Sequence, residues 1–530
     1  MKSEEVRGKR KMQIYVDGNA VRSGNGQKEY PFQTISEAAK IARPGDEVLV
    51  ASGVYREYVD PANAGCEDAR IVYRSVEPGK AVITGAEIVD NWEHLEGDVW
   101  TARVSNGLFG DYNPYTTLVS GDWFIASYTA HTGEVYLNGK SMYEVTSLDK
   151  VKKPEIYKKS WDQAFTVYTW YVEQDEEKNE TVFYVNFQGK NPNEETVEIN
   201  VRENCFYPSK EGIGYITLSG FVVKQAATQW APPTAYQEGM VGPHWSKGWI
   251  IEDCEISDSK CSGISLGKYR QPNNDNKWLK WKFKDGTQTE RDCICQAQRE
   301  GWTKENIGSH IIRRCNIHDC GQTGIVGHLG GVFSIIEDNH IHHINNKQNL
   351  AGAEIGGIKM HAAIDVIIRR NHFHHCTRGL WLDWQAQGTR VTQNLFHDNT
   401  LPNEENANPE GMDGIGEDIF IEISHGPTLV DNNVLLSDRA MKLATQGVAV
   451  VHNLIAGSFT AVGRGVNNGS EKLPSPRYTP YHVPHRTEIN GFMTVLHGDC
   501  RFYNNIFIQK PVRAGMEEIR KLTGDNEWDD

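Results

Sequence analysis

The sequence lacks three features that would each point to a class of protein. No apolar run reaches the roughly 18 residues expected of a transmembrane helix, and the N-terminal stretch MKSEEVRGKRKMQIYVDGN lacks the apolar segment of a secretory signal. Positive charge is scarce, because 55 Lys and Arg stand against 70 Asp and Glu, a formal net charge of -15. Nucleic acids and anionic membranes both need a basic face. We therefore expect a cytoplasmic protein with neither of them as a partner.

Metal-binding spacings are also missing. The ten cysteines are scattered, and their separations match no zinc-knuckle pattern. We interpret them as reduced thiols and predict no metal and no cofactor. The chain is rich instead in glycine (50), tryptophan (14) and tyrosine (21). Many glycines indicate many turns, and abundant aromatic residues suit a β-rich core or stacking on sugars.

A repeat runs through the second half of the chain. Short runs of β-branched and aliphatic residues end in an asparagine, and the repeat spacing is 23 residues from Asn371 to Asn394 and 20 from Asn433 to Asn453. A period in the low twenties, with short strands and no helical pattern, predicts a parallel β-helix whose every coil adds one strand to each of several sheets. A leucine-rich repeat is the alternative solenoid, but no LxxLxL frame recurs. We interpret the asparagines as a stacked ladder at a sharp bend, made of Asn316, Asn339, Asn371, Asn394, Asn433, Asn453 and Asn505, with Cys254 in the same position one coil earlier.

The segment 12–87 is predicted to hold an N-terminal cap and the first coils. YPFQTISEAAKIARPGDEVLVASGVY begins with a helical pattern that Pro44 and Gly45 end, and a strand follows. A solenoid needs such a cap over its open end. The opening looks like that of pectate-lyase-like β-helix proteins.

Between residues 88 and 205 the repeat is absent. Alternating strands there are separated by turn signals such as Asn138-Gly139, which predicts an inserted β-sandwich. Residues 206–530 are predicted to form the main β-helix and to carry the active site, with 270–306 as a long loop. The predicted fold is thus all-β, a right-handed parallel β-helix interrupted by a β-sandwich.

The stretch GLWLDW (379–384) places an acid between two tryptophans. Successive strand residues face opposite ways, so we predict that Leu380, Leu382 and Trp384 face the core while Trp381 and Asp383 face outward. The next coil follows the same rule. Its isoleucines, Ile419, Ile421 and Ile423, are predicted to face the core, and Phe420 and Glu422 to face outward.

Counting back from the ladder pairs the two acids. Asp383 precedes Asn394 by the same number of positions as Glu422 precedes Asn433. Neighbouring strands are about 4.8 Å apart, so the two carboxylates should stack within about 5 to 6 Å. Like charges this close repel, and one carboxyl tends to stay protonated. The alternatives are side chains that turn into water and a calcium site. Glycoside hydrolysis is the chemistry that uses this pair, and retaining enzymes hold their carboxyl groups about 5 to 5.5 Å apart.

Other polar residues fall near the same position on neighbouring coils. His328 stands at the same offset before Asn339, Lys442 stands at that offset before Asn453, and Lys359 and His361 lie near it in the coil that Glu354 opens. Such donors and acceptors suit the hydroxyl groups of a neutral sugar. A cation at position 442 beside Glu422 would lower the pKa of that carboxyl and weaken it as an acid. Lys442 therefore either points elsewhere or favours the ionised form of Glu422 that a later step needs. The 399–416 loop is placed to overhang the pair.

GLWLDWQAQGTRVTQNLFHDN, followed by EDIFIEISHGPTLVDNNVLL, resembles glycoside hydrolase family 120, the β-helix β-xylosidases. ATQWAPPTA (227–235) and HWSKGWIIED (244–253) are similar to that family as well. The resemblance implies that Asp383 is the nucleophile and Glu422 the acid/base. The family's E-x-G-x-I-K-x-H segment falls on Glu354, Lys359 and His361, which the resemblance implies bind the non-reducing sugar.

Three further residues are predicted to bind substrate. Trp123 is expected to lean over the site from the sandwich, Trp381 stands beside the nucleophile, and His425 belongs to the S-H-G-P motif. The resemblance implies a retaining exo-acting β-xylosidase whose partner is a short xylo-oligosaccharide. Arabinose, galactose and glucose remain open as the sugar, and a homo-oligomer remains open as the assembly. A β-helix polysaccharide lyase and a non-catalytic glycan-binding β-helix are the alternative functions.

Overall fold

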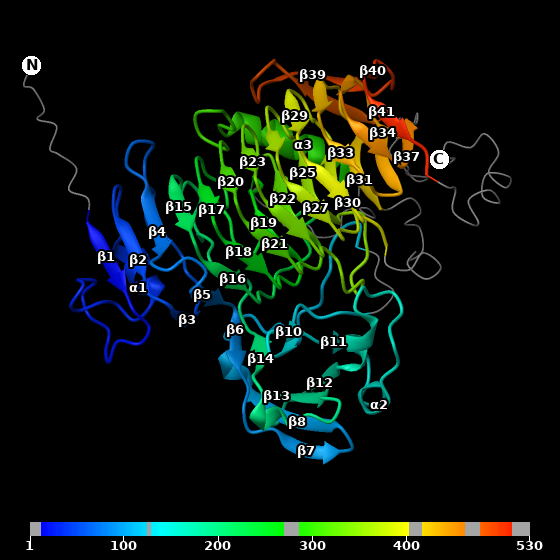
Figure 1. Cartoon of the computed structure of the whole chain (residues 1–530). Helices are drawn as coiled ribbons and strands as arrows, with labels where there is room; N and C mark the ends of the chain where they lie inside the picture. The colour runs from blue at the N-terminus through cyan, green and yellow to red at the C-terminus, as the bar shows by residue number, and fades with distance from the viewer. Residues whose placement is uncertain (1–11, 125–128, 270–285, 402–415, 462–476, 511–530) are drawn as a thin grey trace, which may run out of the picture.

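The computed structural model describes residues 12–124, 129–269, 286–401, 416–461 and 477–510. Within these residues the chain coils through three parallel sheets, and each complete coil adds one strand to each sheet. Figure 1 shows the coils stacked from the N-terminal end to the C-terminal end. The prediction of an all-β, parallel β-helix is confirmed.

Every strand of these sheets is short, so bends follow one another closely. The first sheet contains β1 (Gln13–Val16), β2 (Glu47–Val50), β4 (Ile71–Ser75), β15 (Ile216–Ser219), β17 (Ile250–Glu252), β20 (Ile311–Arg313), β23 (Ile335–Glu337), β26 (Ile367–Arg369), β29 (Thr389–Thr392), β32 (Thr428–Asp431), β35 (Val448–Val451) and β40 (Arg501–Tyr503). The second sheet contains β3 (Gly53–Arg56), β5 (Ala81–Thr84), β16 (Val222–Lys224), β18 (Glu255–Ser257), β21 (Asn316–His318), β24 (His340–His342), β27 (His372–His374), β30 (Leu395–His397), β33 (Val434–Leu435), β36 (Leu454–Ala456) and β41 (Ile506–Ile508). The third sheet contains β19 (Ser262–Ser265), β22 (Thr323–His328), β25 (Gly356–His361), β28 (Leu380–Asp383), β31 (Glu417–Glu422), β34 (Arg439–Ala444) and β37 (Ser458–Ala461).

A ladder of asparagine side chains joins successive coils at the bend between the first and second sheets. Asn394 Nδ2 donates to Asn433 Oδ1 at 2.9 Å, and Asn394 Oδ1 accepts from the Asn371 side chain at 3.1 Å. The same contacts continue from Asn339 to Asn505. The ladder satisfies buried backbone groups at the bend, which would otherwise be costly to bury. The predicted row of ladder asparagines from Asn339 onward is confirmed.

The assignment of Asn316 to this ladder is wrong. The backbone N–H of Cys315 donates to Asn339 Oδ1 at 3.0 Å, so Cys315 holds the ladder position in that coil. Asn316 instead begins β21 and pairs with His340. The error arises because cysteine and asparagine are adjacent in this coil, and sequence alignment alone favoured the asparagine.

The interior of the coils is a continuous apolar core. It includes Leu380, Leu382, Ile419 and Ile421, all fully buried. Trp384 does not belong to it, contrary to the prediction from alternation. β28 ends at Asp383 and Trp384 has a positive φ, so its ring packs outside the main core in a small cluster with Ile423 and Val495. Ile423 belongs to the same small cluster, so its predicted place in the main core is wrong as well.

A helix forms where the sequence predicts one, and the bounds of the N-terminal cap segment at 12–87 stay a prediction. Helix α1 (Ile35–Ile41) begins with a capping box, in which Thr34 accepts from the Glu37 backbone N–H and the Glu37 side chain accepts from Thr34. Ile35, Ala38 and Ala39 are fully buried against the first coils. The helix thus covers the open end of the core.

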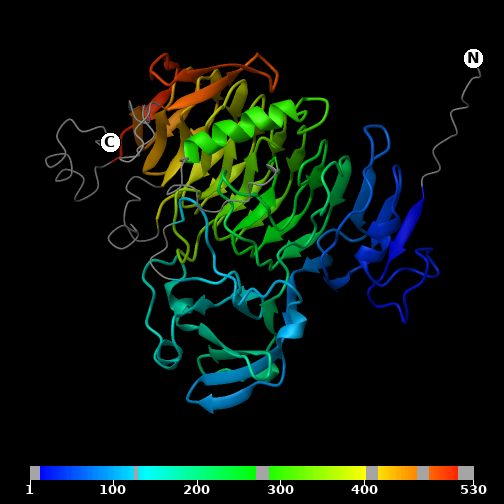
Figure 2. The ribbon, with the colours of Figure 1, turned by 180° about the vertical axis from the view of Figure 1, so that it is seen from behind.

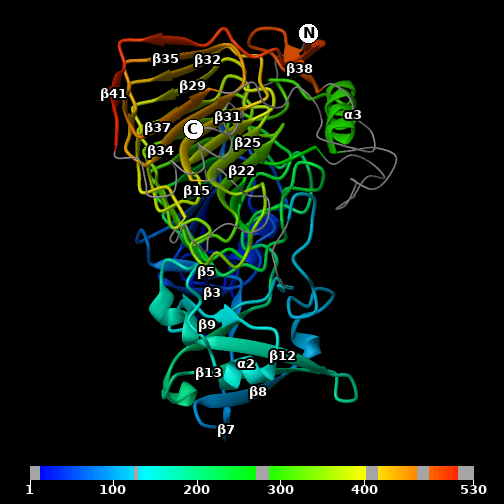
Figure 3. The same ribbon diagram turned by 90° about the vertical axis from the view of Figure 1, so that its right-hand side faces the viewer.

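The region without the repeat forms two sheets beside the coils (Figures 1 and 3). One sheet contains β6 (Ala86–Ile88), β9 (Val135–Leu137), β10 (Lys140–Ser141) and β14 (Val197–Asn200). The other contains β7 (Glu93–Glu96), β8 (Val99–Ser105), β11 (Tyr143–Glu144), β12 (Thr169–Asp175) and β13 (Glu180–Asn186). Residues from both sheets share one apolar cluster, so the region is a sandwich. Its limits at residues 88 and 205 stay a prediction.

The short helix α2 (Leu148–Lys152) and the 3₁₀ turns Asn106–Leu108, Gln163–Val167 and Pro192–Glu194 complete this insertion.

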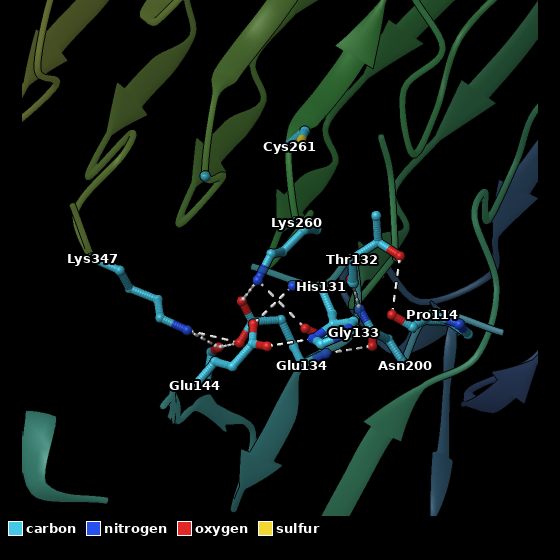
Figure 4. A network of polar contacts seen from close by, with 12 residues as sticks. Pro114, His131, Thr132, Gly133, Glu134, Glu144, Asn200, Lys260, Cys261 and Lys347 are labelled. Carbon is cyan, nitrogen blue, oxygen red and sulfur yellow. Dashed lines mark hydrogen bonds and ion pairs between the residues drawn. The ribbon is translucent and has the colours of Figure 1, made fainter. Parts of the chain in front are cut away.

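A buried ionic network attaches the insertion to the coils (Figure 4). Glu134 of the insertion accepts from Lys260 at 2.6 Å and from Lys347 at 2.7 Å, and both lysines come from the β-helix. Burial opposes ionisation of Glu134, but the two lysines lower its pKa to about 2. The attachment therefore depends on a charged carboxylate held between two cations.

Two elements outside the coils were not predicted. Helix α3 (Gly286–Arg299) lies within the expected long loop, and Figure 2 shows it alongside the coils. The antiparallel hairpin β38 (Tyr478–His482) and β39 (Ile489–Thr494) lies beyond the last strand of the third sheet in sequence. Most of the predicted overhanging loop, 402–415, lies outside the described residues. None of the described helices is both long enough and apolar enough to pass through a membrane.

Candidate active site

Five consecutive strands of the third sheet end at the same level. Their last residues pair in register in the order His328, His361, Asp383, Glu422 and Ala444. Asp383 and Glu422 are therefore direct neighbours on β28 and β31, as counting from the ladder predicts. Neighbouring strands lie about 4.8 Å apart, so the two carboxyl groups share one small region of the outer face.

Lys442 does not continue this row, and its predicted place beside Glu422 is wrong. It pairs with Phe420, two residues earlier on β31, and its Nζ lies 5.5 Å from the centre of that ring. The segment from Ala444 to Asn453 is two residues shorter than the segment from Glu422 to Asn433. The offset that fits Asp383 and Glu422, when counted back from Asn453, therefore overshoots the strand end.

Two nitrogen atoms contact the carboxylate of Asp383. Lys359 Nζ donates to Asp383 Oδ2 at 2.8 Å, and His361 Nε2 lies 3.1 Å from the same oxygen. Asp383 is only 7% exposed. Burial opposes its ionisation, but Lys359 and His361 reverse this and lower the pKa of Asp383 below its usual value. Asp383 Oδ1 has no hydrogen-bond partner among the described residues, so a reactive oxygen remains available.

Glu422 has the opposite environment. Burial raises its pKa, and the neighbouring charge of Asp383 raises it further. Arg477, which precedes the hairpin strand β38, offsets part of this rise from 3.6 Å. The two neighbouring carboxyl groups are thus driven apart, with Asp383 ionised and Glu422 inclined to hold a proton. Such divergence is the usual sign of separate acid and nucleophile roles.

Glu354 closes the other side of the lysine. Glu354 Oε2 lies 3.4 Å from Lys359 Nζ, and burial raises the pKa of Glu354. Ligand atoms of Glu354, His361 and Asp383 lie within 4.8 Å of one another, close enough to share a metal ion. Lys359 already places a positive charge between the two carboxylates, and a divalent cation there would be repelled by it. The donor set therefore fits a protonated lysine better than calcium.

A second ion pair supports the outward aromatic residues. Arg378 donates to Glu417 Oε2 at 2.8 Å, and its guanidinium carbon lies 4.1 Å from the centre of the Trp381 ring and 4.7 Å from that of Phe420. This pair is not among the residues predicted from the sequence. A signal for it exists, because Arg378 and Glu417 each lie five residues before one of the two paired acids.

Two of the other predicted site residues, His328 and Trp381, are buried behind the groups that contact Asp383. His328 stands next to His361 at the start of the row, but it is fully buried and hydrogen-bonded to Glu290 of α3. Trp381 is 5% exposed, and Lys359 Nζ lies 3.0 Å from its ring centre. These two residues therefore hold the groups that face the carboxylates.

Two predicted residues connect neighbouring segments to the site. The backbone carbonyl of Trp123 accepts from the Ala353 N–H at 3.0 Å, beside Glu354, and the Trp123 side chain is 37% exposed. His425 contacts Thr479 of β38, whose hydroxyl lies 2.6 Å from Nε2. His425 thus secures the hairpin whose preceding residue, Arg477, faces Glu422.

Comparison with known proteins bears on the fold and the family of the chain. A family model described as the glycoside hydrolase 120 insertion domain matches residues 89–199, and one described as a right-handed β-helix region matches residues 244–455. The solved structure described as the complex of XylC with xylose is 44% identical, covers 98% of this chain and 81% of its own, and superposes with a TM-score of 0.85.

A more distant structure, described as a glycoside hydrolase, is 12% identical, covers 96% of this chain and 98% of its own, and has a TM-score of 0.52, which shows the fold alone. No curated protein sequence matches the chain. Identity of 44% over nearly the whole length, together with the matching insertion domain, assigns the family: the chain belongs to glycoside hydrolase family 120 and is a glycoside hydrolase.

Proposed function

We propose that the protein is a retaining exo-β-xylosidase that releases xylose from the non-reducing end of short xylo-oligosaccharides. The observation that carries the proposal is the pairing of Asp383 with Glu422 on adjacent strands, with their pKa values shifted in opposite directions. Adjacent strands favour the shorter carboxyl separation used by retaining enzymes, about 5 to 5.5 Å. The relative solved with xylose supports the choice of sugar.

In this mechanism Asp383 attacks the anomeric carbon and forms a covalent glycosyl-enzyme. Lys359 and His361 keep it ionised, and its unbonded Oδ1 is the attacking atom. Glu422 gives its proton to the departing oxygen, becomes a carboxylate, and then takes a proton from the water that hydrolyses the intermediate. Its pKa, raised by burial and by Asp383, suits the first of these steps. Arg477 stabilises the carboxylate that the first step leaves.

Glu354, Lys359 and His361 bind the hydroxyl groups of the non-reducing sugar in this proposal, and Trp123 contributes an exposed ring at the edge. Trp381 has little free surface, so its role is to support Lys359 rather than to stack on the sugar. His328 orients its neighbour His361, and His425 positions the hairpin. Lys442, in register with Phe420, belongs to the surrounding groove.

The decisive experiment follows product stereochemistry. Hydrolysis of aryl β-xyloside by the full chain, monitored by proton NMR, should first yield β-xylose, because two displacements restore the starting configuration. A mechanism-based 2-fluoro-xyloside should label Asp383, as read by peptide mass spectrometry. First-formed α-xylose, or label on another residue, would overturn the assignment. A panel of aryl xylosides, arabinosides, galactosides and glucosides tests the sugar separately.

The two other functions have less support. A polysaccharide lyase of this fold would act on acidic sugars, and the described carboxylates of this site would repel a uronate. A non-catalytic glycan-binding protein has no use for two carboxyl groups placed side by side, because the arrangement costs free energy without a chemical step. If the protein hydrolysed none of the aryl glycosides in the panel, these two alternative functions would have to be reconsidered.

A further inference from the structure

Six of the 19 histidines lie on the outer face of the second sheet, and two more directly follow its strands, on a side of the coils that the proposed reaction does not use. Four of them stack as a column across β21, β24, β27 and β30, with ring centres 4.8 to 5.1 Å apart and ring planes within 8°. The eight residues, here called the histidine face, are His318, His340, His342, His343, His372, His374, His375 and His397. Their core-facing neighbours, such as Ile341 and Phe373, are fully buried, so the histidines point outward.

Three members of the histidine face converge on one point. Ligand nitrogens of His340, His372 and His374 all lie within 4.8 Å of one another. His340 Nε2 and His374 Nε2 are 2.7 Å apart, and His372 Nε2 lies 2.7 Å from His397 Nε2. His372 and His374 are two residues apart on β27, so both side chains project from the same face of the strand.

Hydrogen bonding alone explains each close pair, because a neutral imidazole has one donor and one acceptor nitrogen. It does not explain why three ring nitrogens from two successive coils point at one place. A tetrahedral zinc ion with Zn–N bonds of about 2.0–2.1 Å needs its ligand nitrogens about 3.3 Å apart. The 2.7 Å between His340 Nε2 and His374 Nε2 is about 0.6 Å short of that value, so these two rings would turn slightly apart to bind the ion.

We propose that His340, His372 and His374 form a site for a borderline divalent cation, Zn²⁺, Ni²⁺ or Cu²⁺, that links β24 to β27. Imidazole nitrogen is the ligand these ions prefer, whereas Ca²⁺ and Mg²⁺ take oxygen ligands. The three rings are half-buried, which leaves room for an ion to enter from solvent. A neutral imidazole keeps a lone pair on one of its two ring nitrogens, which is what binding to a metal requires. The bound ion would link two successive coils of the β-helix.

The test uses the full chain produced without a histidine tag and treated with chelator. Equilibrium dialysis against Zn²⁺ or Ni²⁺, with metal counted by mass spectrometry, should yield about one equivalent per chain. Cu²⁺ added in its place should show the electron paramagnetic resonance pattern of several nitrogen ligands. The double variant His372→Gln/His374→Gln should lose both signals while keeping glycosidase activity, because those residues lie on another sheet from the carboxylate pair.

Two control variants make the result specific. Asp383→Asn should keep the metal, since it alters only the other group of ligand atoms, formed with Glu354 and His361. His94→Ala, which removes an exposed histidine of the insertion, should also keep it. Melting temperature and circular dichroism of the double variant in chelator should match those of the wild type in chelator. No stoichiometric binding by the wild type, binding that persists in the double variant, or binding lost in Asp383→Asn would overturn the proposal.

Discussion

Lys359 Nζ lies 2.8 Å from Asp383 Oδ2, and both side chains are buried on adjacent strands, Lys359 two residues before the end of β25 and Asp383 at the end of β28. The lysine also touches the Trp381 ring and faces Glu354, so one cation joins the predicted nucleophile to the predicted sugar-binding acid. A charge held this close to a buried carboxyl governs its ionisation. The pH dependence of the reaction should therefore depend on this lysine.

Replacing Lys359 tests that dependence. Lys359→Met should raise the pKa of Asp383, so the acid limb of kcat/KM should move to higher pH by about 1–3 units, the usual effect of losing an opposite charge at this distance. The measurement is a pH profile on an activated aryl xyloside. Lys442→Met, which removes a cation aligned with Phe420 instead, should leave that limb in place. An unmoved acid limb in Lys359→Met would contradict the assigned role.

Removal of the acid/base should discriminate between leaving groups. Glu422→Ala should lose about 10²- to 10⁴-fold in rate with a poor leaving group, because only such a group needs the proton, and far less with an activated one. Azide should restore turnover as β-xylosyl azide, since a small anion replaces the base in the second step. The readouts are initial rates across a series of aryl xylosides and NMR of the azide product. Equal losses for all leaving groups would assign the acid elsewhere.

The wild-type pH profile follows from the two shifts. The reactive form has Asp383 ionised and Glu422 protonated, so kcat/KM should rise as pH passes the lowered pKa of Asp383 and fall as it passes the raised pKa of Glu422. The falling limb should be steep for poor leaving groups and weak for activated ones. A falling limb of equal depth for both kinds of substrate would indicate a different acid.

Truncation of Asn394, inside the ladder, should destabilise the protein more than truncation of Asn316, outside it. Asn394→Ala leaves the buried backbone N–H of Asn371 without its acceptor, which should lower the free energy of unfolding by about 1–3 kcal/mol or more. Asn316→Ala removes a side chain that begins β21 and contacts His342, so its effect should be clearly smaller. Chemical denaturation of both variants measures the difference. Equal losses would return Asn316 to the ladder.

The ionic attachment of the insertion should fail when its carboxylate is neutralised. Glu134→Gln leaves Lys260 and Lys347 buried beside an uncharged group, and breaking a buried pair in this way costs about 3–5 kcal/mol. In the wild type, the stability supplied by the lowered pKa is present above the usual range of a glutamate and is lost as pH falls toward about 2. Calorimetry as a function of pH reads both effects. Glu195→Gln, at the exposed pair with Lys190, is the control and should change little.

The repeat, the ladder from Asn339 onward and the pairing of Asp383 with Glu422 were all predictable from residue spacing. Spacing suffices there because a parallel β-helix converts a fixed number of residues per coil into a fixed place on the next strand. The same counting of residues could also have predicted the pair Arg378 and Glu417. The count failed for Lys442, where the bend is two residues shorter, and for Asn316, where cysteine takes the ladder position.

Which groups from outside the coils reach the site depends on the folded arrangement of distant segments. Arg477 arrives from the start of a hairpin and Glu290 from a helix inside an expected loop, and neither has a period that ties it to the ladder. The folded arrangement also decides that Trp381 is covered by Lys359 and Arg378. Contacts between coils follow from local spacing, whereas contacts with excursions depend on how separate segments pack, which local spacing does not encode.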